Sequence, residues 1–248
     1  MKYEQNEMAI DCFLLAGRIM MESGAETYRV QDTMLRMARS QNMMDTQSYV
    51  TPTGIIFSLG RTQPTRITSI STRITDLHRI VLVNNVSRKL TSQMITLERA
   101  YDELKRIEKT NYFLPILLQV LAASIASSCF LFLYKGMFTD IPTAFVAGGI
   151  GLYIVTIIHK MTRVKFFSEF LAAVSVGVVA SLSVHYGFGT EVDKIIIGSV
   201  MPLVPGLLIT NAVRDLMAGH FIAGMAKGAE AFLTAFAIGS GIALVLSF

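Results

Sequence analysis

The chain has 248 residues, of which 52% are hydrophobic and 16% are charged, with a formal net charge of +4 at pH 7. Charge is unevenly distributed, because 27 of the first 110 residues are charged but only 13 of the remaining 138. The second part is too apolar for a water-soluble fold, which excludes a single soluble domain, a disordered chain and a collagen-like fibre. The composition predicts a small α+β domain at 1–110 and an α-helical polytopic membrane domain at 111–248.

The charge pattern does not indicate nucleic-acid binding, the cysteines do not indicate a metal site, and the N-terminal stretch does not indicate a signal peptide. Basic residues alternate with acidic ones in the first domain, so no nucleic-acid partner is expected. Cys12 and Cys129 lie in separate apolar runs and supply neither a disulfide framework nor a zinc site. The apolar stretch 8–21 contains charged residues and follows two glutamates, so it is expected to form an amphipathic helix and not a signal peptide.

The first domain is expected to contain four helices and two β-rich segments. In chain order these are helices at 6–21 and 25–39, β-rich segments at 47–60 and 65–72, and helices at 76–90 and 96–109. Ser23 as N-cap and Glu26 three residues later fit a capping box, which predicts a tight glycine turn between the first two helices. The β-rich segments are expected to pair through a turn near 60–64, with Pro52 and Gly54 marking a bulge or an edge.

The second domain is expected to cross the membrane five times. Its charge-free runs are 111–134, 141–158, 170–190, 195–213 and 231–248. Each run, with its flanks, is long enough for the roughly 20 helical residues that cross a bilayer. The loop at 159–165 holds three basic residues and no acidic one, so it is expected to face the cytoplasm. This orientation places 1–110 in the cytoplasm and the C-terminus outside the cytoplasmic membrane.

Small residues recur at close-packing spacing within these spans. The pairs are Ala144/Gly148, Gly224/Gly228 and Ala237/Gly241. Such residues let helix backbones approach closely in lipid. Packing within one bundle is the favoured interpretation, and a specific dimer face is the alternative.

The fourth span is interrupted near its middle by Pro202, Pro205 and Gly206. Proline removes an amide donor and glycine permits an unwound backbone, and irregular backbone at membrane depth survives only where protein buries it or it lines a wet cavity. A second half-helix starting near Gly206 would present free N–H groups that suit an anion or a carboxylate. A simple proline kink is the alternative.

Ionisable residues follow this break. Asn211, Arg214 and Asp215 are spaced i, i+3 and i+4 and therefore share one helix face. Lys227 and Glu230 lie three residues apart at the start of the last span. Because ionisable groups near membrane depth usually mark a substrate or proton path, the basic residues are candidates for binding a carboxylate and the acids for carrying protons. The alternative is that the basic residues snorkel to the cytoplasmic interface, with the acids as salt-bridge partners.

Motifs of known enzyme chemistry are missing from the sequence. It contains no G-x-x-x-x-G-K-[ST] P-loop, no H-E-x-x-H and no G-x-S-x-G. We therefore expect no enzyme activity, no catalytic residues, no cofactor and no metal. The lack of an ATPase motif favours transport driven by a gradient.

Four segments together resemble the threonine/serine exporter family. They are 22–30 (ESGAETYRV), 51–55 (TPTGI), 202–206 (PLVPG) and 210–215 (TNAVRD) with the following Gly219 and His220. They occur in the family's order and span nearly the whole chain. The resemblance implies an inner-membrane exporter of small amino acids or of dicarboxylates such as succinate. It also carries over Gly24, Glu26 and Arg29 as motif residues whose role, as a gate, a subunit contact or a helix turn, stays open.

Single-chain members of that family have more spans than the five expected here. The resemblance therefore implies the larger subunit of the split type of exporter, with a small hydrophobic partner subunit supplying the other spans in the lipid bilayer. Assembly as a homo-oligomer is also left open.

The leading hypothesis is a subunit of a secondary-active exporter of small carboxylates across the cytoplasmic membrane. In it the basic residues orient the carboxylate, the acids couple protons and the broken span shapes the site. Threonine, serine and succinate all carry a carboxylate, so the sequence does not choose among them. The alternative is a membrane-anchored regulatory or sensor protein that acts through its soluble domain.

Overall fold

The computed structural model describes residues 2–60 and 65–247, which form two compact units. The first unit comprises 1–113 together with 207–228, and the second comprises 114–206 together with 229–248. The last part of the chain therefore contributes to both units. The division at residue 110 into a cytoplasmic and a membrane domain stays a prediction.

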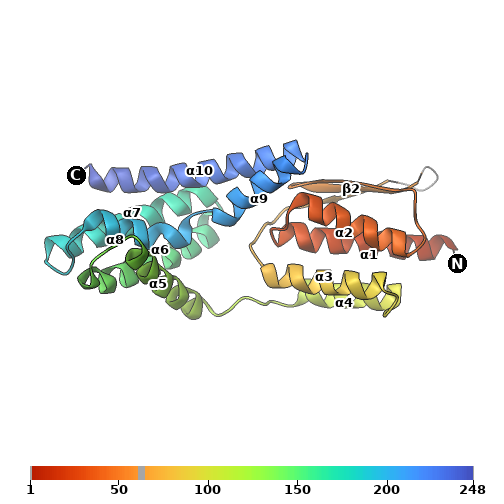
Figure 1. Ribbon diagram of the computed structural model, residues 1–248, viewed down its shortest axis with the longest axis horizontal. Helices are drawn as coiled ribbons and strands as arrows, with labels where there is room; N and C mark the ends of the chain where they lie inside the picture. Colours follow the sequence, from red (N-terminus) through yellow and green to blue (C-terminus); the bar gives the residue numbers. More distant parts are fainter. Residues whose placement is uncertain (1, 61–64, 248) are drawn as a thin grey trace. The chain divides into compact units, whose positions relative to one another are not determined.

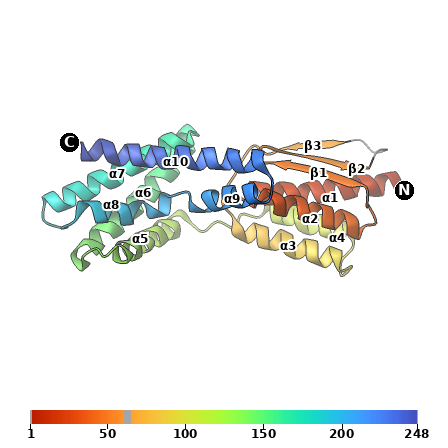
Figure 2. The same cartoon turned by 45° about the horizontal axis from the view of Figure 1, so that its top comes forward.

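The first unit is a layered α+β structure (Figure 1). Its elements are α1 (Lys2–Glu22), α2 (Thr27–Ser40), β1 (Thr46–Thr51), β2 (Gly54–Leu59), β3 (Arg66–Ser69), α3 (Leu77–Thr91), α4 (Leu97–Lys109), α9 (Gly206–Met217) and the start of α10 (Phe221–Leu246). Helices α1 and α2 lie between the three-stranded antiparallel sheet on one side and helices α3 and α4 on the other (Figure 2). Phe13 of α1 and Phe57 of β2 pack edge to face in the core, with ring centroids 6.0 Å apart.

The β-rich segment 47–60 is a hairpin of two strands, and Pro52 lies in its turn and not in a bulge, although β1, which leads into this turn, is an edge strand. Thr51 pairs with Gly54, so Pro52 and Thr53 form the two-residue turn. The Thr51 hydroxyl bonds the Gly54 backbone across this turn, where proline needs no amide partner. The expected antiparallel pairing of β2 with β3 is confirmed, and the predicted turn at 61–64 lies outside the described residues.

The predicted capping box at Ser23 was also wrong. Helix α2 begins at Thr27, with Glu26 in the N-cap position and no side-chain cap of its own. Ser23 is fully buried, and within the described part of the chain its hydroxyl has no hydrogen-bond partner. Because α2 begins at Thr27, Ser23 lies three residues before the N-cap position and cannot cap the helix. The chain turns at Gly24, which adopts φ +86°, a left-handed conformation that favours glycine.

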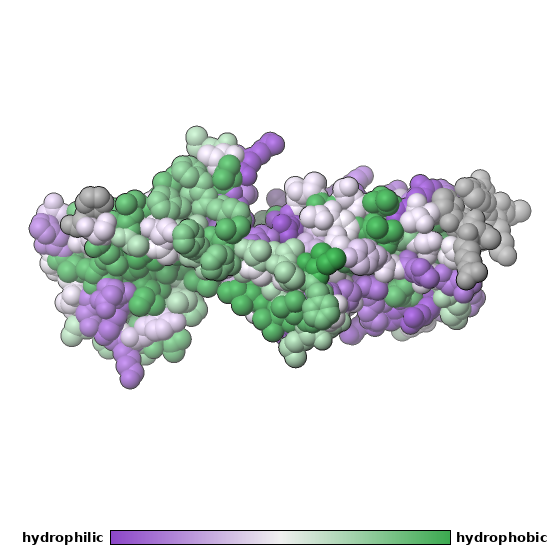
Figure 3. Space-filling view, turned by 90° about the horizontal axis from the view of Figure 1, so that it is seen from above, coloured by the Kyte–Doolittle hydropathy of each residue, from purple (hydrophilic) through white to green (hydrophobic). Residues whose placement is uncertain are grey.

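The second unit is a bundle of apolar helices. It contains α5 (Ile116–Leu133), η1 (Phe138–Asp140), α6 (Ile141–Thr162), α7 (Lys165–His185), α8 (Val192–Val200), η2 (Met201–Leu203) and the rest of α10. Four helical segments of the described chain are long and apolar enough to cross a membrane: 116–133, 138–162, 165–185 and 221–246. A fifth span exists if 192–203 and 206–217 count as one broken span, so the chain has four or five candidate spans. The second unit's visible surface is largely hydrophobic (Figure 3), as expected for contact with lipid.

Glycines bring the helices of the second unit into close contact. A Cβ added to Gly148 of α6 would lie 1.9 Å from the Ser127 hydroxyl oxygen of α5. A Cβ added to Gly241 of α10 would lie 2.6 Å from the Phe170 carbonyl oxygen of α7. Both contacts are within this chain, which supports packing inside one bundle over a dimer face at these two glycines.

The helix break in 195–213 is an interruption and not a simple kink. Helix α8 ends at Val200, a single 3-10 turn follows, and Val204 is extended at ψ 130°. Pro205 separates this residue from Gly206, where α9 begins. Proline at this position ends one helix and lets a new one start, as the sequence predicted.

Candidate functional site

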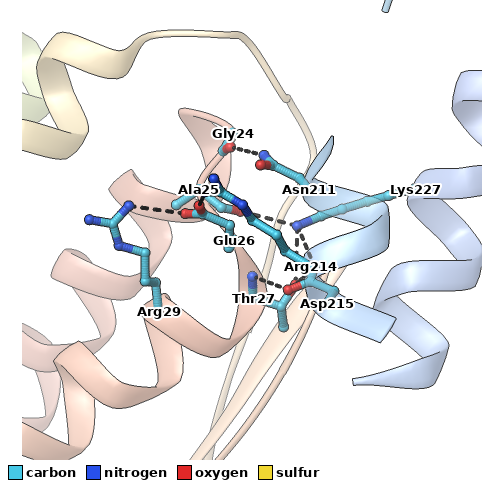
Figure 4. Close-up of polar contacts among 9 residues, drawn as sticks. All are labelled: Gly24, Ala25, Glu26, Thr27, Arg29, Asn211, Arg214, Asp215 and Lys227. Carbon is cyan, nitrogen blue, oxygen red and sulfur yellow. Dashed lines mark hydrogen bonds and ion pairs between the residues drawn. The ribbon is translucent and has the colours of Figure 1, made fainter. Parts of the chain in front are cut away.

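Nine residues from three parts of the first unit form one polar cluster (Figure 4). The turn between α1 and α2 and the first turn of α2 contribute Gly24, Ala25, Glu26, Thr27 and Arg29, and helices α9 and α10 contribute Asn211, Arg214, Asp215 and Lys227. The cluster joins two of the segments on which the family resemblance rests. We call it the turn–hairpin cluster, because α9 and α10 form a helical hairpin.

The hairpin is held tightly enough to bring Asp215 and Lys227 together. Gly219 turns the chain between the helices at φ +83°. A Cβ on Gly224 would lie 2.9 Å from the Ala212 carbonyl oxygen, so only glycine allows this approach. The Lys227 ammonium consequently lies 2.7 Å from the Asp215 carboxylate.

Asp215 is the centre of the cluster and is fully buried. Its Oδ1 accepts the Thr27 backbone N–H at 2.9 Å, and its Oδ2 accepts the Thr27 hydroxyl at 2.8 Å. The carboxylate therefore replaces the missing N-cap of α2 and lies at the positive end of that helix. A buried carboxylate needs such donors, because burying an uncompensated charge is very costly.

Lys227 completes this arrangement from the opposite side. Its side chain is 5% exposed and donates to Asp215 Oδ2, to the Ala25 carbonyl at 3.1 Å and to the Thr27 hydroxyl at 3.2 Å. An ammonium has three donors, and each of them has an acceptor here. Lys227 is thus paired with an acid, as the alternative interpretation held, but its ammonium is buried and not exposed to water as snorkelling would require.

Asn211 and Arg214 hold the outer part of the cluster. The Asn211 amide donates to the Gly24 carbonyl at 2.8 Å, which the left-handed Gly24 exposes. Arg214 donates to Glu26 Oε1 at 2.6 Å, and Arg29 donates to Glu26 Oε2 at 3.3 Å. Glu26 is 7% exposed, whereas the two arginine side chains are half-exposed.

The pKa of Glu26 reflects this clamp. Burial alone would raise the pKa of the carboxyl group. Hydrogen bonds from its own backbone, from Arg214 and from Arg29 outweigh that effect and leave the pKa below its ordinary value. Glu26 therefore stays ionised between the two guanidinium groups at neutral pH.

The structure separates other predicted site residues from this cluster. Glu230 belongs to the second unit, where it pairs with Lys165 of α7 at 2.8 Å. Pro202, Pro205 and Gly206 also belong to the second unit, at the helix break.

Sequence reasoning missed two residues of the cluster and one buried acid of the second unit. Ala25 and Thr27 were quoted only as letters of the family motif, and they act here through a carbonyl, an amide and a hydroxyl. Glu169 of α7 was overlooked because the count of the third apolar run began one residue after it. A single acid bordering a long apolar run is the signal that could have identified it.

Comparisons with known proteins identify the family of this chain. A family model described as "Putative threonine/serine exporter" matches residues 11–248. The probable succinate transporter subunit YjjP of Escherichia coli (strain K12) is 22% identical over 253 residues, covering 100% of this chain and 97% of that protein. The protein of the same name from Klebsiella aerogenes is 22% identical and covers 97% and 92%.

The probable threonine/serine exporter of Mycobacterium tuberculosis is 21% identical over 231 residues, covering 91% of this chain but 44% of that longer protein. No solved structure gives a significant match. The family model covers almost the whole chain, including both halves of the turn–hairpin cluster, and confirms the resemblance drawn from the motifs. The chain belongs to the threonine/serine exporter family.

Proposed function

We propose that this chain is one subunit of a secondary-active exporter that moves a small carboxylate across the cytoplasmic membrane. Its family and its relatives are named as exporters or transporters, and the substrates in those names all carry a carboxylate. Four or five candidate spans support a membrane protein. The word subunit in two of the relatives' names supports a partner, which we propose to be small and hydrophobic.

The turn–hairpin cluster is the observation that carries this proposal. A buried lysine–aspartate pair contributes little net stability, because desolvating both charges offsets their attraction. Here the pair connects the α1–α2 turn to the helices that follow the helix break, and Asp215 and its partner Thr27 both lie in family motifs. We assign the cluster as the lock that holds α2 against α9 and α10 between transport steps.

Arg214 is the residue best placed to bind the substrate carboxylate. Within the described part of the chain it donates only to Glu26, and its side chain is 55% exposed. A guanidinium has five donors in a fixed fork that matches a carboxylate. Lys227, by contrast, has all three donors occupied. A substrate carboxylate would take the place of Glu26 on Arg214.

The cluster also supports the predicted orientation. Residues 24–27 can bond Asp215 and Lys227 only if the α9–α10 turn is on the same side of the membrane as the N-terminal domain. Five spans with the basic loop 159–165 inside put both on the cytoplasmic side and the C-terminus outside. We propose this orientation, in which the helix break at Pro202, Pro205 and Gly206 shapes the substrate path.

Efflux from cells tests the proposal. Cells producing this chain with its candidate partner subunit are loaded with radiolabelled threonine, serine or succinate, and efflux is compared with cells lacking either protein. We expect efflux only when both are present, and at least tenfold slower efflux for Arg214→Gln. Arg36→Gln is the matched control, since Arg36 forms an exposed ion pair with Asp32 on α2, outside the cluster, and should stay near the wild-type rate. Wild-type efflux by Arg214→Gln would overturn the assignment of Arg214.

A further inference from the structure

A second group of ionisable side chains lies in the second unit, between α7 and α10. Lys165 begins α7 and pairs with Glu230 of α10 at 2.8 Å. Glu169 follows Lys165 by one helical turn, and Thr234 follows Glu230 by one turn. The Thr234 hydroxyl lies beside the Glu169 carboxyl, and the charges of Lys165 and Glu230 act on that carboxyl.

Glu169 differs from Lys165 and Glu230, which pair with each other, because a buried oxygen of its carboxyl group has no hydrogen-bond partner in the described part of the chain. The residue is 7% exposed, and its Oε2 is buried without a hydrogen-bond partner in the described part of the chain. The Thr234 hydroxyl, 1% exposed, lies beside it and likewise makes no hydrogen bond of good geometry with any described residue. A buried polar atom of this kind is costly and calls for an explanation.

Charge in this group is not balanced when every acid is ionised. Lys165 is already neutralised by Glu230, so an ionised Glu169 leaves one excess negative charge among apolar helices. One proton shared by the group removes that charge. A carboxyl that holds this proton also gains a donor for an acceptor such as the Thr234 hydroxyl.

Among the described residues, the other elements packed against α7 supply no further buried counter-charge. Helix α6 has His159 and Lys160 in its last turns, and Arg163 follows in the loop, all of them exposed. Helix α8 has Asp193 and Lys194 in its first turn, after the loop that follows the opposite end of α7. The charges that decide whether Glu169 is protonated or ionised are therefore mainly those of Lys165 and Glu230.

We propose that Glu169 is the residue that binds and releases the proton whose inward movement drives export. A proton from the outer side converts its carboxylate to the acid, and the same proton leaves toward the cytoplasm after the substrate has moved out. The step conserves charge and atoms, because one proton enters for each one released. This inference rests on the proposed function and adds the site of coupling to it.

The group favours a proton over a metal cation. No set of three or more His, Cys, Asp or Glu side chains among the described residues could hold a metal ion. Lys165 would repel a cation, and Glu169 and Thr234 offer few of the oxygen ligands that hard cations require. A sodium-coupled exporter would overturn the proposal.

Everted membrane vesicles from cells producing the whole transporter test the role of Glu169. An acidic lumen is imposed by a pH jump, and accumulation of the labelled substrate found in the efflux assay is measured beside substrate–substrate counterflow, which needs no net proton movement. For Glu169→Gln we expect at least a tenfold loss of pH-driven accumulation with counterflow retained. Glu191→Gln is the matched control, because Glu191 pairs with Lys194 near the start of α8 and should retain both activities.

The outcomes separate this inference from the proposed function. Wild-type vesicles without counterflow of any substrate would overturn the exporter function itself. Counterflow with normal pH-driven accumulation in Glu169→Gln, or accumulation driven by a sodium gradient alone, would overturn the role of Glu169. If Glu169→Gln does not reach the membrane, Glu169→Asp carries the test. A shifted pH profile of accumulation then supports the role, and an unchanged profile overturns it.

Discussion

The turn–hairpin cluster of the first unit and the α7–α10 group of the second unit each contain a buried acid, Asp215 or Glu169, yet they differ in how fully that acid is hydrogen-bonded. Both carboxylate oxygens of Asp215 accept hydrogen bonds, and the Lys227 ammonium donates to three acceptors. Glu169 leaves a buried carboxyl oxygen without a partner in the described residues. The same residue chemistry therefore produces two different environments in one chain.

This difference indicates different roles. A fully bonded polar network in a low dielectric is rigid and has one favoured arrangement, which suits a lock. The Glu169 carboxyl has an oxygen without a hydrogen-bond partner in the described part of the chain, and the nearby Lys165 already pairs with Glu230. Protonation of Glu169 therefore breaks no ion pair, which suits a titrating group. Substitutions that preserve shape but remove charge should consequently act in opposite ways at the two sites.

Asp215→Asn is expected to have the largest effect. Asparagine keeps the size of the side chain but leaves the buried Lys227 ammonium uncompensated, and breaking a buried pair in this way costs about 3–5 kcal/mol. Thermal unfolding of the detergent-solubilised protein should show the loss as a lower Tm. Combining it with Lys227→Met should recover part of the stability, since no buried charge remains unpaired. A double variant no more stable than Asp215→Asn would contradict the pairing.

Gly24→Ala should have the next largest effect, because it strains the turn that receives Asn211. Gly24 lies at φ +86°, where a Cβ costs about 1–2 kcal/mol. The expected result is a lower Tm and weaker docking of the Gly24 carbonyl on Asn211. Gly239→Ala is the control, since a Cβ there meets open space within a helix and should not lower the Tm. Equal Tm values for the two alanine variants would refute the strain argument.

The pH dependence of stability should reveal the Glu26 clamp. The folded pKa of Glu26 lies below its ordinary value, so ionised Glu26 stabilises the fold above the ordinary pKa, about 4.3, and this contribution is lost as the pH falls through the folded pKa. The Tm of wild type should therefore exceed that of Glu26→Gln at pH 7, and the gap should close in acid. Arg36→Gln, in an exposed ion pair with Asp32, serves as the control with little effect at any pH. A gap that widens in acid would show that the shift has the opposite sign.

Much of the fold follows from local sequence. The helices at 77–91 and 97–109, the apolar spans and the helix break were all predictable, because apolar periodicity and proline act over a few residues. The hairpin at Pro52 was misread because a turn and a bulge share the same residues. The shared face of Asn211, Arg214 and Asp215 was predicted from spacing, and two of its members are buried together.

The partners of those residues could not be predicted in the same way. Thr27 and Asp215 are 188 residues apart in the chain, and nothing local indicates that an aspartate on α9 caps α2. Instead, the sequence offered Ser23 as the cap, a local solution that the longer turn rules out. Lys227 and Glu230 share a spacing of three but serve different units, because partner choice depends on tertiary packing.

Glu169→Gln provides the sharpest contrast with Asp215→Asn, although its effect on stability should be the smallest. The amide removes the charge of a carboxyl that has no counter-ion of its own, and Lys165 keeps its bond to Glu230. We therefore expect a Tm equal to or above that of wild type, measured in the same detergent. Glu230→Gln is the matched control and should lower the Tm, because it removes the carboxylate that the Lys165 ammonium contacts at 2.8 Å. If Glu169→Gln lowered the Tm as much as Asp215→Asn, the Glu169 carboxylate would be a fixed structural charge, and the distinction between a lock and a titrating group would fail.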